Sequence, residues 1–389
     1  MKLNIGVLFG GESVEHEVSI ISAIQAINAL DKERYNVVPI YLAKDKGLYS
    51  DPSLSKIDCY TDLELLKNKQ PQVYFVKEKN KVFLKRVKSS LFSKPQPIDL
   101  VIPVVHGTNV EDGTVQGFLQ IIGVPYSGCG VIAAGVGQDK VVMKNVLESN
   151  GLPLVDWTWF YYNDFIGKKE EYLKKVEKLG YPVIVKPSKL GSSVGIAIAN
   201  NQEELISALE DAKIYDNKIV IEKVVKNLVE INASVLGDVF DARVSVLEKV
   251  GGSDEFLSYN DKYQGGSKDG KGMASTQRVI PAPLSVEKTS EIQALALKTF
   301  KVLEAAGVSR IDFMLDADTD KVYVNEINTI PGSLSFYLWE ASGMSFLQLM
   351  DNLIRQAINR QRREEKMIFS YQTNILENFS RNGSKGMKK

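Results

Sequence analysis

Two short segments near residue 310 constrain this chain more than any other feature. Residues 310–316 and 322–328 read as two strands that are joined by a short Asp/Ala/Thr connection. Strand side chains alternate between faces with a period of two, so Arg310 and Asp312 share a face. On the second strand, the expected shared face carries Val322, Val324, Glu326 and Asn328. Antiparallel pairing of the two strands would therefore gather charged and amide side chains on one side of a hairpin.

The chemistry of this hairpin face predicts a metal and anion site. The oxygens of Asp312, Glu326 and Asn328 suit Mg²⁺ that is held jointly by protein and substrate phosphates. Arg310 beside them suits negative charge that develops during a reaction. The alternative is a surface hairpin with a hydrated charged face. The apolar residues that flank the charges, such as Ile311, favour the partly buried site.

A Gly/Ser loop follows the apolar strand expected at 182–187. Lys186 ends that strand, and the loop runs through Gly191, Ser192 and Gly195. Glycines let backbone N–H groups approach an anion, serine hydroxyls add donors, and lysine supplies a charge for phosphate oxygens. The loop lacks the Gly-Lys-Ser/Thr ending of a Walker A motif. It is either a plain turn or, together with the hairpin, a nucleotide lid.

Composition excludes several classes of protein. The chain has 389 residues, with 48 Lys plus Arg balanced by 48 Asp plus Glu, so no net field favours nucleic acid or a membrane surface. Two cysteines cannot form a disulfide framework, and two histidines are too few for a zinc cluster. No apolar run approaches the roughly 20 residues that span a bilayer, and the N-terminal segment reads as a strand. We therefore expect a cytoplasmic protein.

Alternating strand and helix patterns predict an α/β fold with several domains. We expect domains at 1–129, 130–221 and 222–366, followed by a polar tail at 367–389. Three further polar positions stand at strand ends or helix starts, where ligands often bind: Glu15, His106 and Glu222. For Glu15, ordinary helix capping is the competing explanation, and for Glu222, a charged strand end.

These segments, in this order, resemble the D-alanine–D-alanine ligase family of ATP-grasp enzymes from about residue 3 to about 355. The matching motifs are Gly10-Gly-Glu-Ser-Val-Glu15-His-Glu-Val-Ser19, His106-Gly, Glu111-Asp-Gly-Thr-Val-Gln-Gly117, Gln138-Asp-Lys140, Lys186 with Gly191-Ser-Ser-Val-Gly195, Tyr259-Asn-Asp-Lys262-Tyr263, Arg310-Ile-Asp312 and Glu326-Ile-Asn328-Thr-Ile-Pro-Gly332. Each motif is modest alone, but together in register they are specific. The resemblance implies three domains: an N-terminal parallel-sheet substrate domain, a central ATP-grasp lid and a C-terminal catalytic domain.

The resemblance also implies an activity and a set of roles. ATP would phosphorylate the carboxylate of one D-alanine, and the amine of a second would attack the acyl phosphate during peptidoglycan precursor synthesis. Catalytic positions would be Glu15, Ser192, Tyr263, Arg310 and Gly332. Amino-acid substrates would contact Glu15, His106, Ser192, Tyr337 and Leu338. ATP would contact Lys140, Lys186, Glu222, Lys223, Glu230 and Lys262. Two Mg²⁺ ions, which Mn²⁺ can replace, would bind Asp312, Glu326 and Asn328. The family also suggests a homodimer.

The chain departs from the family pattern where the second substrate should bind. The family usually carries Ser followed by Leu there, and this chain has Tyr337 and Leu338, followed by Trp339 and Glu340. A second hypothesis is therefore a D-alanine–D-X ligase, with D-serine, D-lactate or another molecule as acceptor. A third, from a different class, is an ATP-binding protein without ligase activity. The filled catalytic positions argue against the third.

Overall fold

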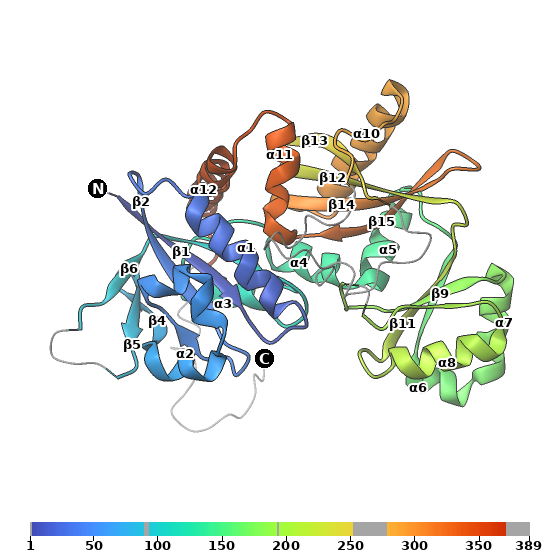
Figure 1. The fold of residues 1–389 in the computed structure, drawn as a ribbon, viewed down its shortest axis with the longest axis horizontal. Helices are drawn as coiled ribbons and strands as arrows, with labels where there is room; N and C mark the ends of the chain where they lie inside the picture. Colours follow the sequence, from blue (N-terminus) through green and yellow to red (C-terminus); the bar gives the residue numbers. More distant parts are fainter. Residues whose placement is uncertain (1, 89–92, 193, 252–277, 371–389) are drawn as a thin grey trace, which may run out of the picture.

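The computed structural model describes residues 2–88, 93–192, 194–251 and 278–370. These residues form three sheets, which contain β1–β7, β8–β11 and β12–β15 in the order of the sequence (Figure 1). Lys262 and Tyr263, predicted to bind ATP and to act in catalysis, lie outside the described residues. None of the helices in these ranges combines the length and the apolar character that a membrane span requires.

The first sheet has seven strands in the order β6-β5-β4-β3-β2-β1-β7. Its strands are β1 (Leu3–Gly10), β2 (Tyr35–Leu42), β3 (Leu48–Tyr49), β4 (Gln72–Glu78), β5 (Lys81–Arg86), β6 (Gln96–Ile98) and β7 (Leu100–Val105). Only β2, β1 and β7 pair in parallel, and the other pairings are antiparallel. The predicted parallel pairing is thus present only among the three strands at the β7 end of the sheet. Every residue of β7 is buried, as expected for a parallel strand with both faces covered.

The helices associated with the first sheet are α1 (His16–Ala29), α2 (Leu63–Lys69) and α3 (Thr114–Ile122), with short 3₁₀ turns η1 (Pro52–Ser55) and η2 (Ile57–Tyr60). A fourth helix comes from the far end of the chain. Helix α12 (Phe346–Glu364) packs against α1 and β7, and its Leu349, Leu353 and Ile354 belong to the same core as β1. Figure 1 shows this red helix beside the blue N-terminal elements.

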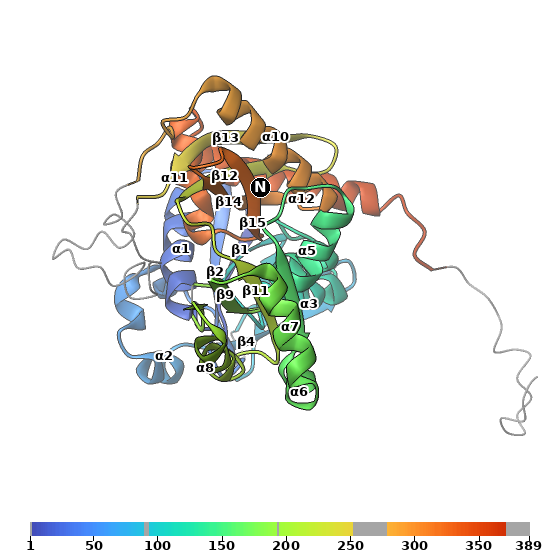
Figure 2. The ribbon, with the colours of Figure 1, turned by 90° about the vertical axis from the view of Figure 1, so that its right-hand side faces the viewer.

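The second sheet is antiparallel, in the order β10-β9-β11-β8. Its elements are β8 (Trp157–Tyr161), α6 (Tyr162–Gly167), α7 (Lys169–Leu179), β9 (Val183–Pro187), β10 (Ala197–Ala199), α8 (Gln202–Ala212) and β11 (Lys218–Lys223). All three helices share one core with one face of the sheet (Figure 2). Lys186 and Glu222 lie on the opposite face, because they alternate with the core residues Val185 and Ile221.

The third sheet is also antiparallel, in the order β13-β12-β14-β15. Its strands are β12 (Leu228–Gly237), β13 (Ala242–Lys249), β14 (Gly307–Asp316) and β15 (Lys321–Asn328), and its helices include α10 (Val286–Val302) and α11 (Phe336–Ala341). Ile311 and Phe313 share a core with Phe300 of α10. Helices α4 (Val131–Gln138) and α5 (Lys140–Ser149) also contribute to this core, through residues such as Met143 and Leu147.

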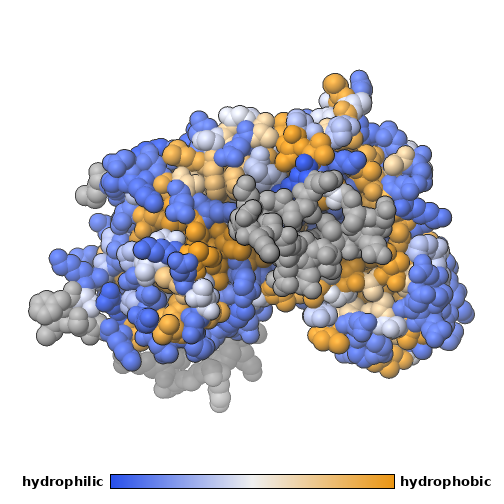
Figure 3. All heavy atoms as spheres, in the orientation of Figure 1, coloured by the Kyte–Doolittle hydropathy of each residue, from blue (hydrophilic) through white to orange (hydrophobic). Residues whose placement is uncertain are grey.

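Packing therefore differs from the domain boundaries that the sequence suggests. Residues 131–149 join the core of the third sheet rather than that of the second, and α12 joins the first core rather than the third. The second sheet forms a separate lobe around its own core. In the space-filling view, a notch separates this lobe from the part of the molecule that contains the first sheet (Figure 3). Hydrophilic side chains dominate the outer surface of the lobe near α7. The active-site candidates lie where the lobe faces the other two sheets.

Candidate active site

A small cavity of about 80 Å³ lies where the three sheets meet. Its walls come from the β1–α1 connection, the end of β7, the start of α5, the loop after β9 and the β14–β15 hairpin. The predicted residues that line it are Glu15, His106, Lys140, Ser192, Arg310, Glu326, Asn328 and Gly332. Side chains that are far apart in the sequence thus converge on one volume.

The hairpin places its charges as the alternation predicts, with one exception. Arg310 pairs with Asn328 and Asp312 pairs with Glu326 across β14 and β15. A β-bulge between Asp312 and Phe313 then shifts the register, so that Asn325 is an additional residue on β15. The prediction that Val322 and Val324 share the face of Glu326 is therefore wrong. Both valines are in the core on the other side of the sheet.

The bulge gives the site an extra polar group. Asn325 and Glu326 are consecutive, yet both contact site lysines: the Oδ1 of Asn325 is 3.4 Å from the Nζ of Lys186, and the Oε2 of Glu326 is 3.1 Å from the Nζ of Lys140. A regular strand would send neighbouring side chains to opposite faces. Asn325 is a site residue that the sequence reasoning missed, and two adjacent polar residues in an alternating strand were the available signal.

Arg310 and Asp312 form a bidentate pair. The Nε of Arg310 donates to Oδ1 of Asp312 at 2.6 Å, and its NH2 donates to Oδ2 at 2.7 Å. Burial alone would lower the pKa of Arg310, but the charge of Asp312 raises it, so the guanidinium stays protonated. Asn328 donates its amide to Oδ2 of Asp312 at 3.0 Å. Asn328 therefore contacts Asp312 through its amide nitrogen and not through its amide oxygen.

The first sheet holds the loop that follows β15. The Nδ1 of His106 donates to the carbonyl of Ile330 at 2.8 Å, and its Nε2 lies 3.0 Å from the hydroxyl of Ser22. That hydroxyl oxygen accepts from the backbone N–H of Ser333 at 2.9 Å. Burial lowers the pKa of His106 to about 4, so the ring is neutral. His106, predicted to contact substrate, here positions the loop that carries Gly332.

Glu111 also binds the loop that follows β15. Its carboxylate accepts from the backbone N–H of Ile330 at 2.8 Å, from the hydroxyl of Thr329 at 3.1 Å and from the N–H of Gly107 at 3.1 Å. Burial and the nearby charge of Glu15 raise the pKa of Glu111 to about 7. The sequence placed Glu111 in a matching motif without giving it a role.

Glu15 connects the first sheet to the lid loop after β9. The hydroxyl of Ser192 donates to its carboxylate. Two glycines allow this approach: a Cβ built on Gly191 would lie 3.0 Å from Oε2 of Glu15, and one on Gly107 would lie 2.9 Å from it. Glu15 and Ser192, two of the catalytic positions that the resemblance implied, are thus in direct contact.

Glu222 lies between two lysines. One carboxylate oxygen is 2.8 Å from the Nζ of Lys186, and the other is 2.8 Å from the Nζ of Lys144. The side chain of Glu222 is 1% exposed. The resemblance implied that Glu222 contacts ATP, and in the structure its carboxylate lies between two lysine side chains.

The remaining predicted residues lie outside the cavity. Lys223 and Glu230 are exposed, at the end of β11 and near the start of β12. Leu338 is fully buried. The hydroxyl of Tyr337 donates to the buried carboxylate of Glu248 at 3.0 Å, and burial raises its pKa to about 12. Tyr337 is thus already committed to a partner within the protein.

The site fits a divalent metal only through a mixed set of ligands. Within the described ranges, no three His, Cys, Asp or Glu side chains form a cluster suited to a metal. Asp312 and Glu326 are direct partners across the hairpin, and Asn328 lies one pair further along the same face. Two carboxylates and one amide oxygen match the hard-oxygen preference of Mg²⁺, with substrate phosphates needed to complete the shell.

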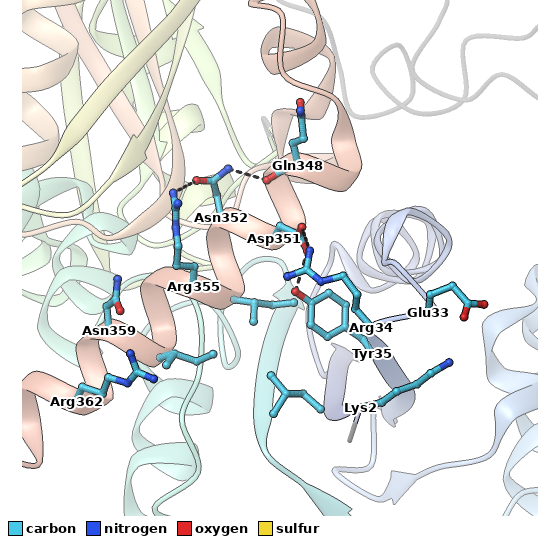
Figure 4. Close-up of a pocket in the computed structure, with 13 residues that line it drawn as sticks. Lys2, Glu33, Arg34, Tyr35, Gln348, Asp351, Asn352, Arg355, Asn359 and Arg362 are labelled. Atoms are coloured by element: carbon cyan, nitrogen blue, oxygen red, sulfur yellow. Dashed lines mark hydrogen bonds and ion pairs between the residues drawn. The ribbon is translucent and has the colours of Figure 1, made fainter.

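A larger groove of about 800 Å³ lies elsewhere, between α12 and the starts of β1 and β2 (Figure 4). Asp351 of α12 binds Arg34, and it also accepts from the hydroxyl of Tyr35 at 2.8 Å. None of the predicted site residues lines this groove. These contacts of Asp351 connect α12 to the start of β2.

Comparison with known proteins identifies the family. The model of the D-ala D-ala ligase N-terminus matches residues 4–129, and that of the D-ala D-ala ligase C-terminus matches residues 146–355. The chain belongs to the D-alanine–D-alanine ligase family. A D-alanine–D-alanine ligase of Thermosipho melanesiensis is 40% identical over 96% of this chain and 98% of its own. One from Caldicellulosiruptor bescii is 40% identical over 95% and 99%, respectively.

Solved structures of the family agree with the fold. The D-alanine–D-alanine ligase from Coxiella burnetii matches with a TM-score of 0.78 and 29% identity, over 94% of this chain and 96% of its own. VanG D-Ala:D-Ser ligase from Enterococcus faecalis matches with a TM-score of 0.73 and 27% identity, over 92% and 100%. The predicted family and the three-part ATP-grasp fold class are therefore confirmed.

Proposed function

We propose that the chain is an ATP-dependent ligase that joins two D-alanines into D-alanyl-D-alanine. The observation that carries the proposal is the convergence of residues from all three sheets on one cavity, with a cationic side and a carboxylate side. Family membership supports the same reaction, as do relatives at 40% identity whose name is D-alanine–D-alanine ligase. The product would enter peptidoglycan precursor synthesis.

The phosphate-binding part of the site would come from two lysines on different elements. Lys140 begins α5, and Lys186 lies on the polar face of β9, opposite the β14–β15 hairpin. Asp312, Glu326 and Asn328 would hold Mg²⁺, which when bound neutralises charge on the phosphates of ATP. Lys223 and Glu230 are proposed to reach adenine and ribose from the rim, and Lys262 is proposed to act near the γ-phosphate.

The acyl-transfer part would use Glu15, Arg310 and the loop at Gly332. Glu15 would bind the ammonium group of the first D-alanine, while Ser192 closes the lid over it. ATP would transfer its γ-phosphoryl group to that D-alanine's carboxylate. The amine of the second D-alanine would then attack the carbonyl carbon, form the amide bond and expel phosphate. Arg310 and the N–H of Gly332 would stabilise the oxyanion, and each such donor is typically worth about 3 kcal/mol.

The test is a product analysis of purified protein with ATP, Mg²⁺ and D-alanine, measuring both dipeptide mass and phosphate release. We expect D-alanyl-D-alanine with one phosphate released per dipeptide. Phosphate release without any dipeptide, with D-alanine alone or with any acceptor, would contradict the proposal. It would favour an ATP-binding protein without ligase activity.

A second candidate is a ligase with a different second substrate. The observation that favours it is Tyr337, which stands where the family usually has serine and whose hydroxyl is bound to Glu248. The side chain of Arg278 stacks over the tyrosine ring at 4.7 Å and its Nε lies 3.3 Å from Glu248. The surroundings of position 337 therefore have a bulk and a charge pattern that a serine would not give.

Acceptor competition separates the two candidates. D-Alanine, D-serine and D-lactate would be supplied together, and the mixed products would be counted by mass. A clear preference for D-alanine supports the first candidate. Preference for another acceptor that shifts toward D-alanine in Tyr337→Ser would support the second. We further propose a cytoplasmic homodimer, which light scattering on a sizing column would test as a doubled molar mass.

A further inference from the structure

Lys144 is a buried cation without a role in the proposed reaction. It lies one helical turn after Lys140 on α5, and its side chain is 0% exposed. Its Nζ is 2.8 Å from Oε1 of Glu222 and 5.9 Å from the ring of Trp157. A charge removed from water is strongly destabilising unless a partner compensates for it. Glu222 is that partner.

Glu222 serves two lysines at once. Lys144 contacts one of its oxygens, and Lys186 contacts the other at 2.8 Å. Burial alone would raise the pKa of Glu222, but these two cations lower it to about 2. Burial lowers the pKa of Lys144, and the charge of Glu222 opposes that shift. With both lysines protonated, the cluster of two lysines and one carboxylate carries a net positive charge. That excess makes one lysine available to another anion.

The two lysines differ in what else they can reach. The Nζ of Lys186 also lies 3.4 Å from Oδ1 of Asn325 on β15, so it stands between the second and third sheets. Lys140 lies on the same side, beside Glu326. Lys144 faces Glu222 and Trp157, away from the hairpin contacts. A phosphate between the sheets would meet Lys186 and Lys140, but not Lys144.

We propose that Lys144 is a positioning residue that keeps Glu222 neutralised while Lys186 transfers from Glu222 to a phosphate of ATP. This inference rests on the proposed use of ATP. Without Lys144, the transfer would leave a buried carboxylate without a cation, so Lys186 would stay on Glu222. Lys144 thus controls ATP affinity through Lys186, without touching the nucleotide.

The experiment is a double-mutant cycle on affinity for a non-hydrolysable ATP analogue with Mg²⁺, measured by calorimetry. Lys144→Met should weaken binding by about tenfold or more, because it removes one partner of a buried pair. In the Glu222→Gln background the same change should weaken binding by no more than about twofold, because no carboxylate then competes for Lys186. Lys144→Arg should retain most of the affinity. Lys298→Met, at an exposed lysine of α10, is the matched control.

Each outcome decides the proposal. Equal loss from Lys144→Met in both backgrounds, or unchanged affinity in the folded single variant, would overturn it. If Lys144→Met alone does not fold, Lys144→Gln replaces it in the cycle: a tenfold loss confined to the background that keeps Glu222 supports the proposal, and equal losses in both backgrounds overturn it. Failure of the wild-type protein to bind the analogue would instead contradict the proposed function.

Discussion

Glu111 shows how one side chain can link two cores. It lies in the connection between β7 and α3, and its carboxylate accepts hydrogen bonds from Thr329 and Ile330 of the loop that carries Gly332. Burial and the neighbouring charge of Glu15 raise its pKa to about 7, so near neutral pH it is partly protonated. The carboxyl therefore carries its proton in the folded state at pH values where the unfolded chain has lost it.

The sign of the resulting pH dependence follows from proton uptake. Between the unfolded pKa, near 4.5, and about 7, the native state binds more protons at Glu111 than the unfolded state does. The contribution of Glu111 to the free energy of unfolding is therefore fully present at low pH and is lost as the pH rises through that window. Relative to Glu111→Gln, the free energy of unfolding of the wild type should decline by up to about 3 kcal/mol from pH 4.5 to 7.5. Urea denaturation at several pH values measures it, and parallel curves for both proteins would contradict it.

Glu326 carries a second prediction at this scale. It pairs with Lys140 at 3.1 Å and faces Asp312 across the hairpin, so under the proposed function it would serve both the metal and the lysine that binds phosphate. Glu326→Gln should reduce ATP turnover by about 100-fold or more, because an amide cannot replace the carboxylate charge. Phosphate release with D-alanine measures the loss, with Glu177→Gln, at an exposed glutamate of α7, as control. Turnover within a few-fold of wild type would rule out the metal assignment.

At the scale of elements, the 3₁₀ turn η3 (Gly332–Ser335) holds three consecutive non-glycine residues in the left-handed region. Ser333, Leu334 and Ser335 have φ values of 53°, 53° and 49°. Such a conformation costs L-residues about 1–2 kcal/mol each. The contacts of Ile330 and Ser333 with the first sheet hold the turn in place. Strain is thus concentrated beside the predicted oxyanion donor.

Ser335 allows this strain to be measured. Its hydroxyl is buried and has no hydrogen-bond partner among the described residues. Ser335→Gly should be more stable than Ser335→Ala by about 1 kcal/mol, because both remove the hydroxyl and only glycine relieves the left-handed backbone. Thermal unfolding of the two variants measures the difference. A more stable alanine variant would show that the turn is not strained at this residue.

The hairpin shows what a sequence can and cannot predict about an element. Alternation predicted the pairing of Arg310, Asp312, Glu326 and Asn328 on one face, and the structure confirms it. The same reasoning put Val322 and Val324 on that face, because a period of two has no place for a bulge. One extra residue, Asn325, reverses the order of faces, and only the hydrogen-bond register reveals where it lies.

At the scale of the whole molecule, three cores divide the chain unequally. The second sheet has a core of its own, while the first and third exchange elements through α12 and the loop after β15. Alternating strand and helix patterns predicted the α/β fold but could not assign a helix to a sheet, because an apolar stripe fits any apolar surface. That is why residues 131–149, expected in the central domain, pack in the core of the third sheet instead.

This division predicts separate units of unfolding. Amides of β8–β11 should exchange with solvent as one cooperative group, at lower protection than those of β1, β7 and β14. Hydrogen exchange with mass-spectrometric readout measures both groups. Adding an ATP analogue and Mg²⁺ should raise protection of β9 and β11 by about tenfold or more, because ligand binding stabilises the closed lobe. Equal protection of all three sheets without ligand would contradict the division.

Helix α12 also has a consequence for biosynthesis. It supplies Leu349, Leu353 and Ala357 to a core whose first strand begins at Leu3. A ribosome making this chain would therefore release the N-terminal strands long before the helix that covers them. Apolar surface would stay exposed on the nascent protein until synthesis is nearly complete, and such surface favours aggregation and chaperone binding. A truncated product that stops after β15 would have the β14–β15 hairpin but an incomplete first core.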